Sequence, residues 1–490
     1  MSRQGTKTGA RASGRERPTE ERAGRWLLVV VGVLLLAVVM PVVLRGGLLA
    51  DEYVICMRPI REGGYGAYLD AIWRDTGVVR PARFIELFLI SKTCTTVPFG
   101  FTILVPLSLK FVTAFLLFGL LRDLGLRAPW PAIGTAIWLL EPVGTEAELW
   151  PAALHVLFGL AFALAALRSY QRGSTLWGGI ATLGAALSVE QVIFAFPLAV
   201  WLLTPAQHRR RSTTVALAVM ATVLVAYALW PGDNPRQAVP LIERLQYVFD
   251  QPEWYLFFPA AGIGLYSGAL AFLWAFPFSV VVVGLGAAGG LWFAPFLRDH
   301  SEGGLDRKTL GRLALATGAL VVLANLPLIV TEVGYSARTF TPTWLVLAGA
   351  AALIGARVSS RRARVLAVLG GLFAAFALLS LALSVSVRVR TDRFDEAAAH
   401  WIAERTQDGD VVAVCDVGRT AVDPAPLGAF HLHALHTPSG EWIEYLTGRV
   451  VDFRRSGERY WGSRCPDLTG ADLVARFPDL VAAVSGGADA

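Results

Sequence analysis

Charge is scarce in this sequence of 490 residues, because only 17% of its residues are Asp, Glu, Lys or Arg while 54% are hydrophobic. Soluble domains carry about 25% charged residues, and a single hydrophobic core stops growing beyond about 250–300 residues. One water-soluble globule cannot bury this much apolar surface. The net charge of +6 is divided among short segments, which is not the pattern of a nucleic-acid-binding surface. A soluble enzyme and a nucleic-acid-binding protein are therefore both disfavoured.

Motifs for cofactors and metals are also missing. No P-loop, Gly-x-Gly-x-x-Gly fingerprint or serine nucleophile elbow occurs in a fitting context. The run His431, His433 and His436 invites a zinc interpretation, but no cysteine or carboxylate stands at ligand spacing. We therefore predict neither a cofactor nor a metal site.

Uncharged runs of about twenty residues, the length that crosses a bilayer, are what the sequence has instead. We predict eleven membrane crossings, of which the third and sixth are short enough that one pair of runs is alternatively re-entrant. The predicted runs are 26–44, 102–121, 128–142, 151–167, 174–188, 191–204, 213–230, 268–297, 311–331, 342–356 and 365–387. The predicted fold is an all-α polytopic membrane domain, 26–387, followed by a small α/β or α+β domain, 388–490.

The distribution of Lys and Arg predicts the direction of these crossings. The segments expected in the cytoplasm together hold 22 Lys and Arg residues, whereas the longer segments expected outside hold 9. By the positive-inside rule, the N-terminus is cytoplasmic and the domain 388–490 is extracytoplasmic, in a multi-pass protein of the cell membrane. Each predicted cytoplasmic segment is too short for a nucleotide-binding domain.

The first 25 residues form a polar tail that we expect to be disordered and cytoplasmic. A cleavable signal peptide is the competing interpretation. The tail is long for such a peptide, and Arg45–Ala50 is a poor cleavage site. A retained anchor helix is therefore the prediction.

Two regions outside the membrane carry secondary-structure patterns. In the first outside loop, 46–101, apolar residues from Tyr65 to Ile72 recur at helical spacing, which predicts a short helix on the membrane surface. A second helix is expected over Phe84–Ile90, after Arg80 and Pro81, and an amphipathic stretch over Val239–Phe249. In the C-terminal domain, Asp392–Thr406 is predicted to be a helix and Asp410–Cys415 a strand.

All four cysteines fall on the side that is oxidising in this topology. Cys56 and Cys94 share the first outside loop, while Cys415 and Cys465 share the C-terminal domain. Pairing 56–94 and 415–465 is the expected choice among three connectivities. Four buried free thiols are the alternative.

Ionisable residues from six regions are predicted to gather at the outer leaflet, where membrane charges are costly and indicate function. Each has a plainer interpretation: a solvated helix end, a loop charge, a helix cap, a snorkelling cation or a packed histidine. The functional interpretation gains weight because all of them share one surface. These residues are Asp51, Glu52, Lys110, Glu146, Glu148, His155, Glu190 and Arg338.

Six short elements in a fixed order resemble the GT-C superfamily of polytopic glycosyltransferases, which includes protein O-mannosyltransferases, aminoarabinose transferases and actinobacterial mannosyl- and arabinofuranosyltransferases. The elements, spread over about 26–345, are Asp51-Glu52, Arg80-Pro81 with Arg83, Arg122–Gly125, Pro142–Ala147 with Trp150, Leu187–Glu190 with Pro197, and Arg338–Pro342. The chain departs from the pattern at Val189, where relatives often have Lys, and at Lys110, where many have His or Asn.

The resemblance implies transfer of a sugar from a polyprenyl-phosphate donor to an envelope glycan, glycolipid or protein acceptor, on the outer face and with inversion. Asp51 is then the expected general base, with Glu52 orienting or replacing it. Arg338, then Lys110 or Arg83, would hold the leaving phosphate. Glu146, Glu148, Glu190 and His155 would bind sugar or acceptor, and Trp150 or Tyr53 would stack on a sugar. No divalent metal is required.

Two other functional classes compete with this enzyme. A lipid-linked glycan flippase or transporter predicts ionisable residues near span centres and an inverted repeat, and neither is seen in the sequence. A non-catalytic envelope-assembly scaffold would tolerate joint loss of Asp51, Glu52 and Arg338.

Overall fold

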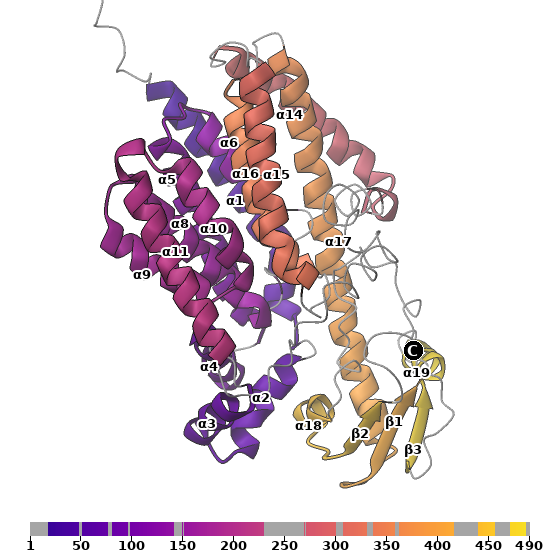
Figure 1. The fold of residues 1–490 in the computed structure, drawn as a ribbon. Coiled ribbons are helices and arrows are strands. Elements are labelled where there is room, and N and C mark those ends of the chain that lie inside the picture. Colours follow the sequence, from indigo (N-terminus) through magenta and orange to yellow (C-terminus); the bar gives the residue numbers. More distant parts are fainter. Residues whose placement is uncertain are drawn as a thin grey trace, which may run out of the picture.

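The computed structural model describes residues 18–48, 51–76, 81–96, 99–141, 149, 151–229, 269, 271–299, 307–330, 337–357, 362–415, 440–455 and 471–486. Within them the chain forms a bundle of helices with a small three-stranded sheet near the C-terminus (Figure 1). The predicted fold class, a helical polytopic membrane protein with a small C-terminal mixed domain, is confirmed. The stretch Val239–Phe249 and the three C-terminal histidines lie outside the described residues.

Each of the eleven predicted apolar runs overlaps at least one helix, but the run 268–297 is divided by a turn at 275–277, just before α14. Among the described residues, six helices are long and apolar enough to cross a membrane, and α10 and α16 contain shorter apolar stretches. α6 has 10 residues and is only about 15 Å long, so it is too short to cross a bilayer alone. The helices are α1 (Pro18–Arg45), α5 (Leu104–Asp123), α6 (Trp130–Leu139), α8 (Leu154–Gln171), α9 (Thr175–Ala186), α10 (Glu190–Leu203), α11 (Ala206–Leu229), α14 (Phe278–Asp299), α15 (Arg307–Val330), α16 (Ala337–Gly355) and α17 (Ala363–Ala403).

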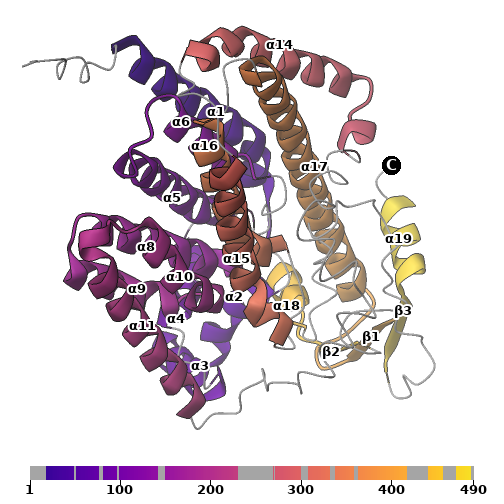
Figure 2. The same cartoon turned by 45° about the horizontal axis from the view of Figure 1, so that its top comes forward.

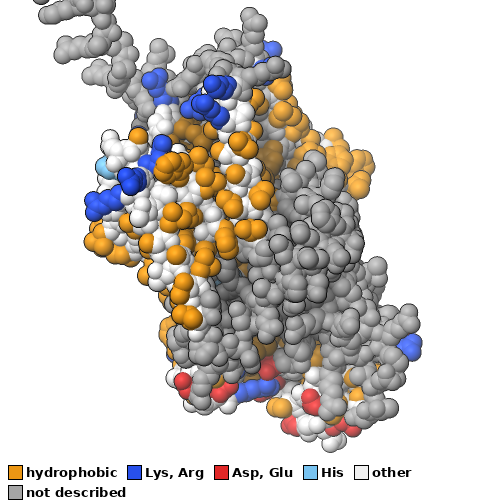
Figure 3. Space-filling view, in the orientation of Figure 1, with side chains coloured by type: hydrophobic (Ala, Val, Ile, Leu, Met, Phe, Trp, Pro, Cys, Tyr) orange, Lys and Arg blue, Asp and Glu red, His pale blue; other side chains and the backbone are white. Residues whose placement is uncertain are grey.

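The two ends of the bundle differ in charge. Helix ends that the sequence assigns to the cytoplasm meet at one end, where Arg168 of α8 donates to the Asp123 carboxylate of α5 over 3.0 Å and His208 of α11 lies against Gly173. Lys and Arg side chains gather at this upper end in Figure 3, whereas Asp and Glu gather at the lower end. A concentration of Lys and Arg at one end is what the positive-inside rule leads one to expect. It also agrees with the prediction that successive helices cross the membrane in opposite directions.

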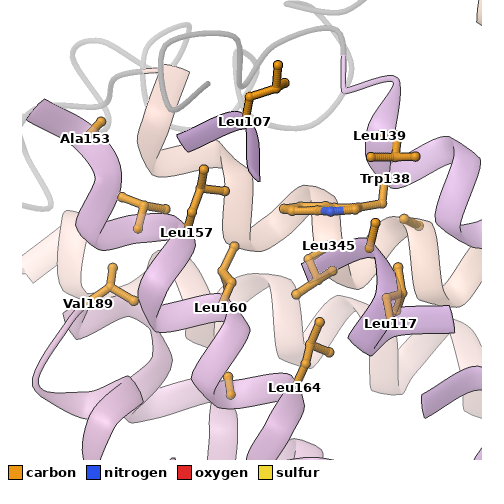
Figure 4. Close-up of a cluster of buried hydrophobic side chains, with 14 of the residues drawn as sticks. Leu107, Leu117, Trp138, Leu139, Ala153, Leu157, Leu160, Leu164, Val189 and Leu345 are labelled. Atoms are coloured by element: carbon orange, nitrogen blue, oxygen red, sulfur yellow. The ribbon is translucent and has the colours of Figure 1, made fainter. Parts of the chain in front are cut away.

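The centre of the bundle is a close-packed apolar cluster around α5, α6 and α8 (Figure 4). Leu157, Leu160 and Leu164 of α8 recur on one helix face and pack with Trp138 of α6, which is fully buried. In lipid the hydrophobic effect does not drive apolar helices together, so their association depends on close van der Waals packing, which small residues allow. Gly159 of α8 leaves room for the side chain of Val189, directly before α10.

The segment after α1 folds into helices rather than an open loop: α2 (Asp51–Arg61), α3 (Tyr65–Thr76), α4 (Pro81–Thr96) and the 3-10 turn η1 (Phe99–Ile103). α2 begins with two acidic residues and ends with Arg58 and Arg61 in its last turn, which complements the helix dipole. It stops before Gly63 and Gly64, whose φ angles of 78° and 135° suit glycine. α4 begins at Pro81, where a missing N–H costs nothing.

α17 continues through residue 388 as one helix of 41 residues. The helix predicted separately over Asp392–Thr406 is therefore the end of α17. The change from apolar to charged composition marks where the helix leaves the apolar bundle, and no glycine or proline stands there to end it. Beyond it, β1 (Val411–Cys415), β2 (Asp452–Arg455) and β3 (Leu473–Arg476) form a parallel sheet in the order β2-β1-β3, with α18 (Glu441–Thr447) and α19 (Phe477–Gly486).

A second apolar cluster joins the segment α2–α4 to this C-terminal part. It contains Tyr53 and Tyr68 with Phe394, Trp442 and Phe453. The apolar face of α3 belongs to it, so the predicted helix is present but its face packs on protein rather than on a membrane surface. α2 and α18 lie side by side at the end opposite the start of α1 (Figures 1 and 2).

Candidate active site

Several helices that carry candidate residues begin at the same end of the bundle. Asp51 and Glu190 are the first residues of α2 and α10, and Arg338 and His155 are the second residues of α16 and α8. The 3-10 turn η2 (Pro151–Ala153), which precedes α8, contacts both α2 and α4. Helix N-termini present free N–H groups and a positive dipole end, which favour anions such as phosphate.

Glu52 is buried and forms an ion pair with Arg388 of α17, with its Oε2 atom 3.7 Å from Nη2. Arg388 also lies 3.4 Å from the Asp392 carboxylate and donates to the Gly47 carbonyl over 2.6 Å. Glu52 is therefore engaged in holding α2 against α17. Of the two roles expected for it, orienting its neighbour fits this geometry better than acting as the base.

Tyr53 is only 2% exposed and packs edge-to-face on Tyr445, with ring centroids 5.7 Å apart. Burial raises its pKa well above the usual value, and the carboxylates of Asp395 and Asp392 raise it further. A ring so enclosed favours a packing role between α2 and the C-terminal domain over the expected stacking on a sugar.

Lys110 of α5 donates to the Glu141 carboxylate just after α6, over 2.7 Å, and both side chains are fully buried. The ammonium also lies 4.2 Å from the centroid of the Trp138 ring. The Thr341 side chain faces Glu141 from α16, one helical turn after Arg338. The pair thus joins α5 to the end of α6, beside α16, the helix that carries the expected phosphate-binding arginine.

A disulfide joins Cys56 of α2 to Cys94 of α4, which is the first of the two expected pairings. It links the helix that begins with Asp51 to the helix that contains Arg83. Cys465 lies outside the described residues, so the pairing 415–465 stays a prediction.

The structure gives only the backbone for four candidates, namely Asp51, Arg83, Glu190 and Arg338. Glu146, Glu148 and Trp150 lie outside the described residues. His155 is 9% exposed, near the start of α8. Among the described residues, no three His, Cys, Asp or Glu side chains come together as a metal site would require.

Sequence reasoning missed Arg388, Asp392 and Glu141 as members of the site region. The i, i+4 spacing of Arg388 and Asp392 is a usable signal for an ion pair on one helix face. Their pairing with the segment after α1 was not predictable, because more than three hundred residues separate Arg388 from Gly47.

Known proteins resemble this chain in structure and not in sequence. No protein-family model matches the chain, and no curated protein matches it. The chain is similar to the crystal structure of ArnT from Cupriavidus metallidurans bound to undecaprenyl phosphate, with 12% identity over 88% of this chain and 90% of that chain and a TM-score of 0.43. At this identity and TM-score the similarity carries no argument about family or activity, and the proposed function rests on the chain's own residues.

Proposed function

We propose that this protein is a membrane glycosyltransferase that moves a sugar from a polyprenyl-phosphate donor to a glycan, glycolipid or protein acceptor of the cell envelope. One observation carries the proposal: the helix ends that bear Asp51, His155, Glu190 and Arg338 lie at one end of the bundle, opposite the arginine-rich end. A lipid-linked donor keeps its chain in the bilayer and presents its phosphate at that level.

The arginine-rich end faces the cytoplasm in this proposal, by the positive-inside rule. The N-terminal tail is then cytoplasmic, and α2–α4 and the C-terminal domain are extracytoplasmic. The disulfide between Cys56 and Cys94 supports this direction, because disulfides persist on the oxidising side of the membrane.

Asp51 acts as the general base in the proposed reaction. It takes the proton of the acceptor hydroxyl while that oxygen forms a bond to the anomeric carbon. The bond from the anomeric carbon to the phosphate oxygen breaks, and polyprenyl phosphate leaves with the electron pair, so the anomeric centre inverts. Arg338, at the start of α16, is assigned the main contact with the departing phosphate.

The remaining expected residues have supporting roles. Arg83 adds positive charge near the phosphate, whereas Lys110, the other expected phosphate contact, is already paired with Glu141 and contributes less. Glu146, Glu148, Glu190, His155 and Trp150 bind sugar or acceptor. No step in this scheme requires a metal ion.

The test is an Asp51→Asn variant in membrane vesicles. The vesicles receive a panel of polyprenyl-phosphate pentoses and hexoses with cell-envelope extract as acceptor, and release of polyprenyl phosphate is measured. Wild-type protein is expected to release it from one panel member, and Asp51→Asn to release it about a thousandfold more slowly, the scale of a lost general base. Asp70→Asn, an exposed carboxylate on α3, is the matched control. Undiminished release by Asp51→Asn at normal membrane level would exclude Asp51 as the base.

A further inference from the structure

The backbone just before α2 is held from a distant part of the chain. The Arg388 guanidinium of α17 donates to the Gly47 carbonyl over 2.6 Å, and the Gly47 N–H donates to the Asp392 carboxylate over 2.9 Å. Both backbone hydrogen-bonding groups of one residue are therefore fixed by the same helix. The chain turns tightly against α1 just before Gly47, since a Cβ on Gly46 would lie 2.5 Å from the Val42 carbonyl oxygen.

The same guanidinium holds the start of α2 on the other side of Asp51. Its Nη2 atom is 3.7 Å from Glu52, and Arg388 and Glu52 are both fully buried. Gly47 and Glu52 thus flank Asp51 in sequence, four residues before it and one residue after it. A charged hydrogen bond holds the chain at Gly47, and a buried ion pair holds it at Glu52. Both interactions are strengthened by a low dielectric constant, so Arg388 anchors the chain on either side of Asp51.

We infer that Arg388 is a positioning residue, which with Asp392 sets where Asp51 stands relative to the helix bundle. This inference rests on the proposed function. The guanidinium spreads its charge over three nitrogens, so Arg388 donates to the Gly47 carbonyl through Nη2 while Nη2 and Nε also face the carboxylates of Glu52 and Asp392. Precise placement matters because a shift of about 1 Å in a reacting group can cost a factor of about a hundred in rate.

If Arg388 and its partners only stabilised the fold, removing their charges would have a different effect on activity. Buried ion pairs can often be replaced together by neutral groups with little loss of stability, whereas removal of one partner is costly. A variant that removes all the charges of the group at once therefore separates folding from positioning. Such a variant is Arg388→Met/Glu52→Gln/Asp392→Asn. Arg388→Lys keeps the charge but cannot reach all three partners.

The experiment measures kcat and KM of both variants in vesicles, with the panel donor that the wild type uses. Membrane level and the Cys56–Cys94 disulfide, read by thiol alkylation, report on assembly. We expect kcat to fall about a hundredfold in the triple variant and about tenfold in Arg388→Lys. KM should stay within about twofold, and assembly should be normal. Arg405→Met, an exposed arginine after α17 that pairs with Glu404, should match the wild type.

Two results would overturn the inference. Wild-type kcat in a normally assembled triple variant would show that the charges serve stability alone. A raised KM with unchanged kcat would place Arg388 in donor binding. If the triple variant does not accumulate, wild-type kcat in Arg388→Lys overturns the inference. Full activity of Asp51→Asn would exclude Asp51 as the base, and release of polyprenyl phosphate from no member of the panel would overturn the proposed function. Both outcomes are distinct from these results because neither involves Arg388.

Discussion

Two buried ionic groups within the described part of the chain are built differently. Lys110 and Glu141 form a balanced pair inside the bundle, with their charged atoms 2.7 Å apart and a tryptophan ring alongside. Arg388 lies between the bundle and the C-terminal domain, with longer distances of 3.4 and 3.7 Å to Asp392 and Glu52. The first group joins helices that are neighbours in sequence. The second group binds the backbone of Gly47, which is far from α17 in sequence. Its geometry should therefore affect activity, in addition to its charge balance.

Lys110→Met should have the largest effect on stability. It leaves the Glu141 carboxylate buried without its cation, which costs about 3–5 kcal/mol. Thermal unfolding of the purified protein in detergent measures the change. The double variant Lys110→Met/Glu141→Met should recover most of the loss, because a balanced pair can be replaced by apolar side chains of similar volume.

The double variant also sharpens the contrast between the two groups. If it unfolds like the wild type and keeps the KM for donor, then Lys110 serves packing and lies outside the phosphate site. A double variant that stays as unstable as Lys110→Met would show that the pair does more than balance its own charges, and the contrast with the Arg388 group would fail.

Loss of the disulfide should have the next largest effect. Cys56→Ala/Cys94→Ala opens a loop with a sequence separation of 38 residues, which lowers stability by about 2–4 kcal/mol on a chain-entropy estimate. Thermal unfolding with and without reductant checks this, since reductant should change the wild type and not the variant. α2 is held covalently to α4 and ionically to α17, so this variant also tests whether the Arg388 group keeps α2 in place alone. Unchanged kcat with lowered stability would support the view that the disulfide stabilises the fold while the Arg388 group keeps α2 in place.

The sequence predicted the helices of the bundle well for a physical reason. A span must satisfy its backbone groups internally and exclude charge, so long uncharged runs such as 102–121 leave little choice of structure. Outside the membrane, water can satisfy backbone groups and charge is not excluded, so the requirement on spans does not predict the structure there. α2 was not predicted as a helix, and α17 was divided at residue 388, because a change in composition does not stop a helix.

The candidate site was predicted only in its outline. The acidic start of α2 and the cluster of helix ends follow from local sequence. The partners of Glu52 and Lys110 do not, because each comes from a different helix. Arg388 reads in the sequence as an ordinary charge after an apolar run. Its role depends on the fold that brings α17 beside the segment after α1.

The titration of Tyr53 should report its burial and, after that, the negative charge beside Arg388, and it gives the smallest predicted effect. Burial, then Asp395 and Asp392, raise its pKa above 10 in the folded protein, while the unfolded chain has the ordinary value of about 10. The folded state therefore keeps this proton where the unfolded state loses it. The contribution of Tyr53 to the free energy of unfolding is fully present below pH 10. It is lost as the pH rises toward the pKa of the folded state, by up to about 1.4 kcal/mol per pH unit.

Unfolding of wild type and Tyr53→Phe at about pH 9 and about pH 11 isolates this contribution, because phenylalanine cannot ionise. The wild type should lose more stability between the two pH values than the variant does. An equal loss in both proteins would mean that the Tyr53 proton is not held more tightly on folding. Neither burial nor the carboxylates beside Arg388 would then favour the neutral phenol of Tyr53, and the two buried ionic groups would be more alike than their geometry indicates.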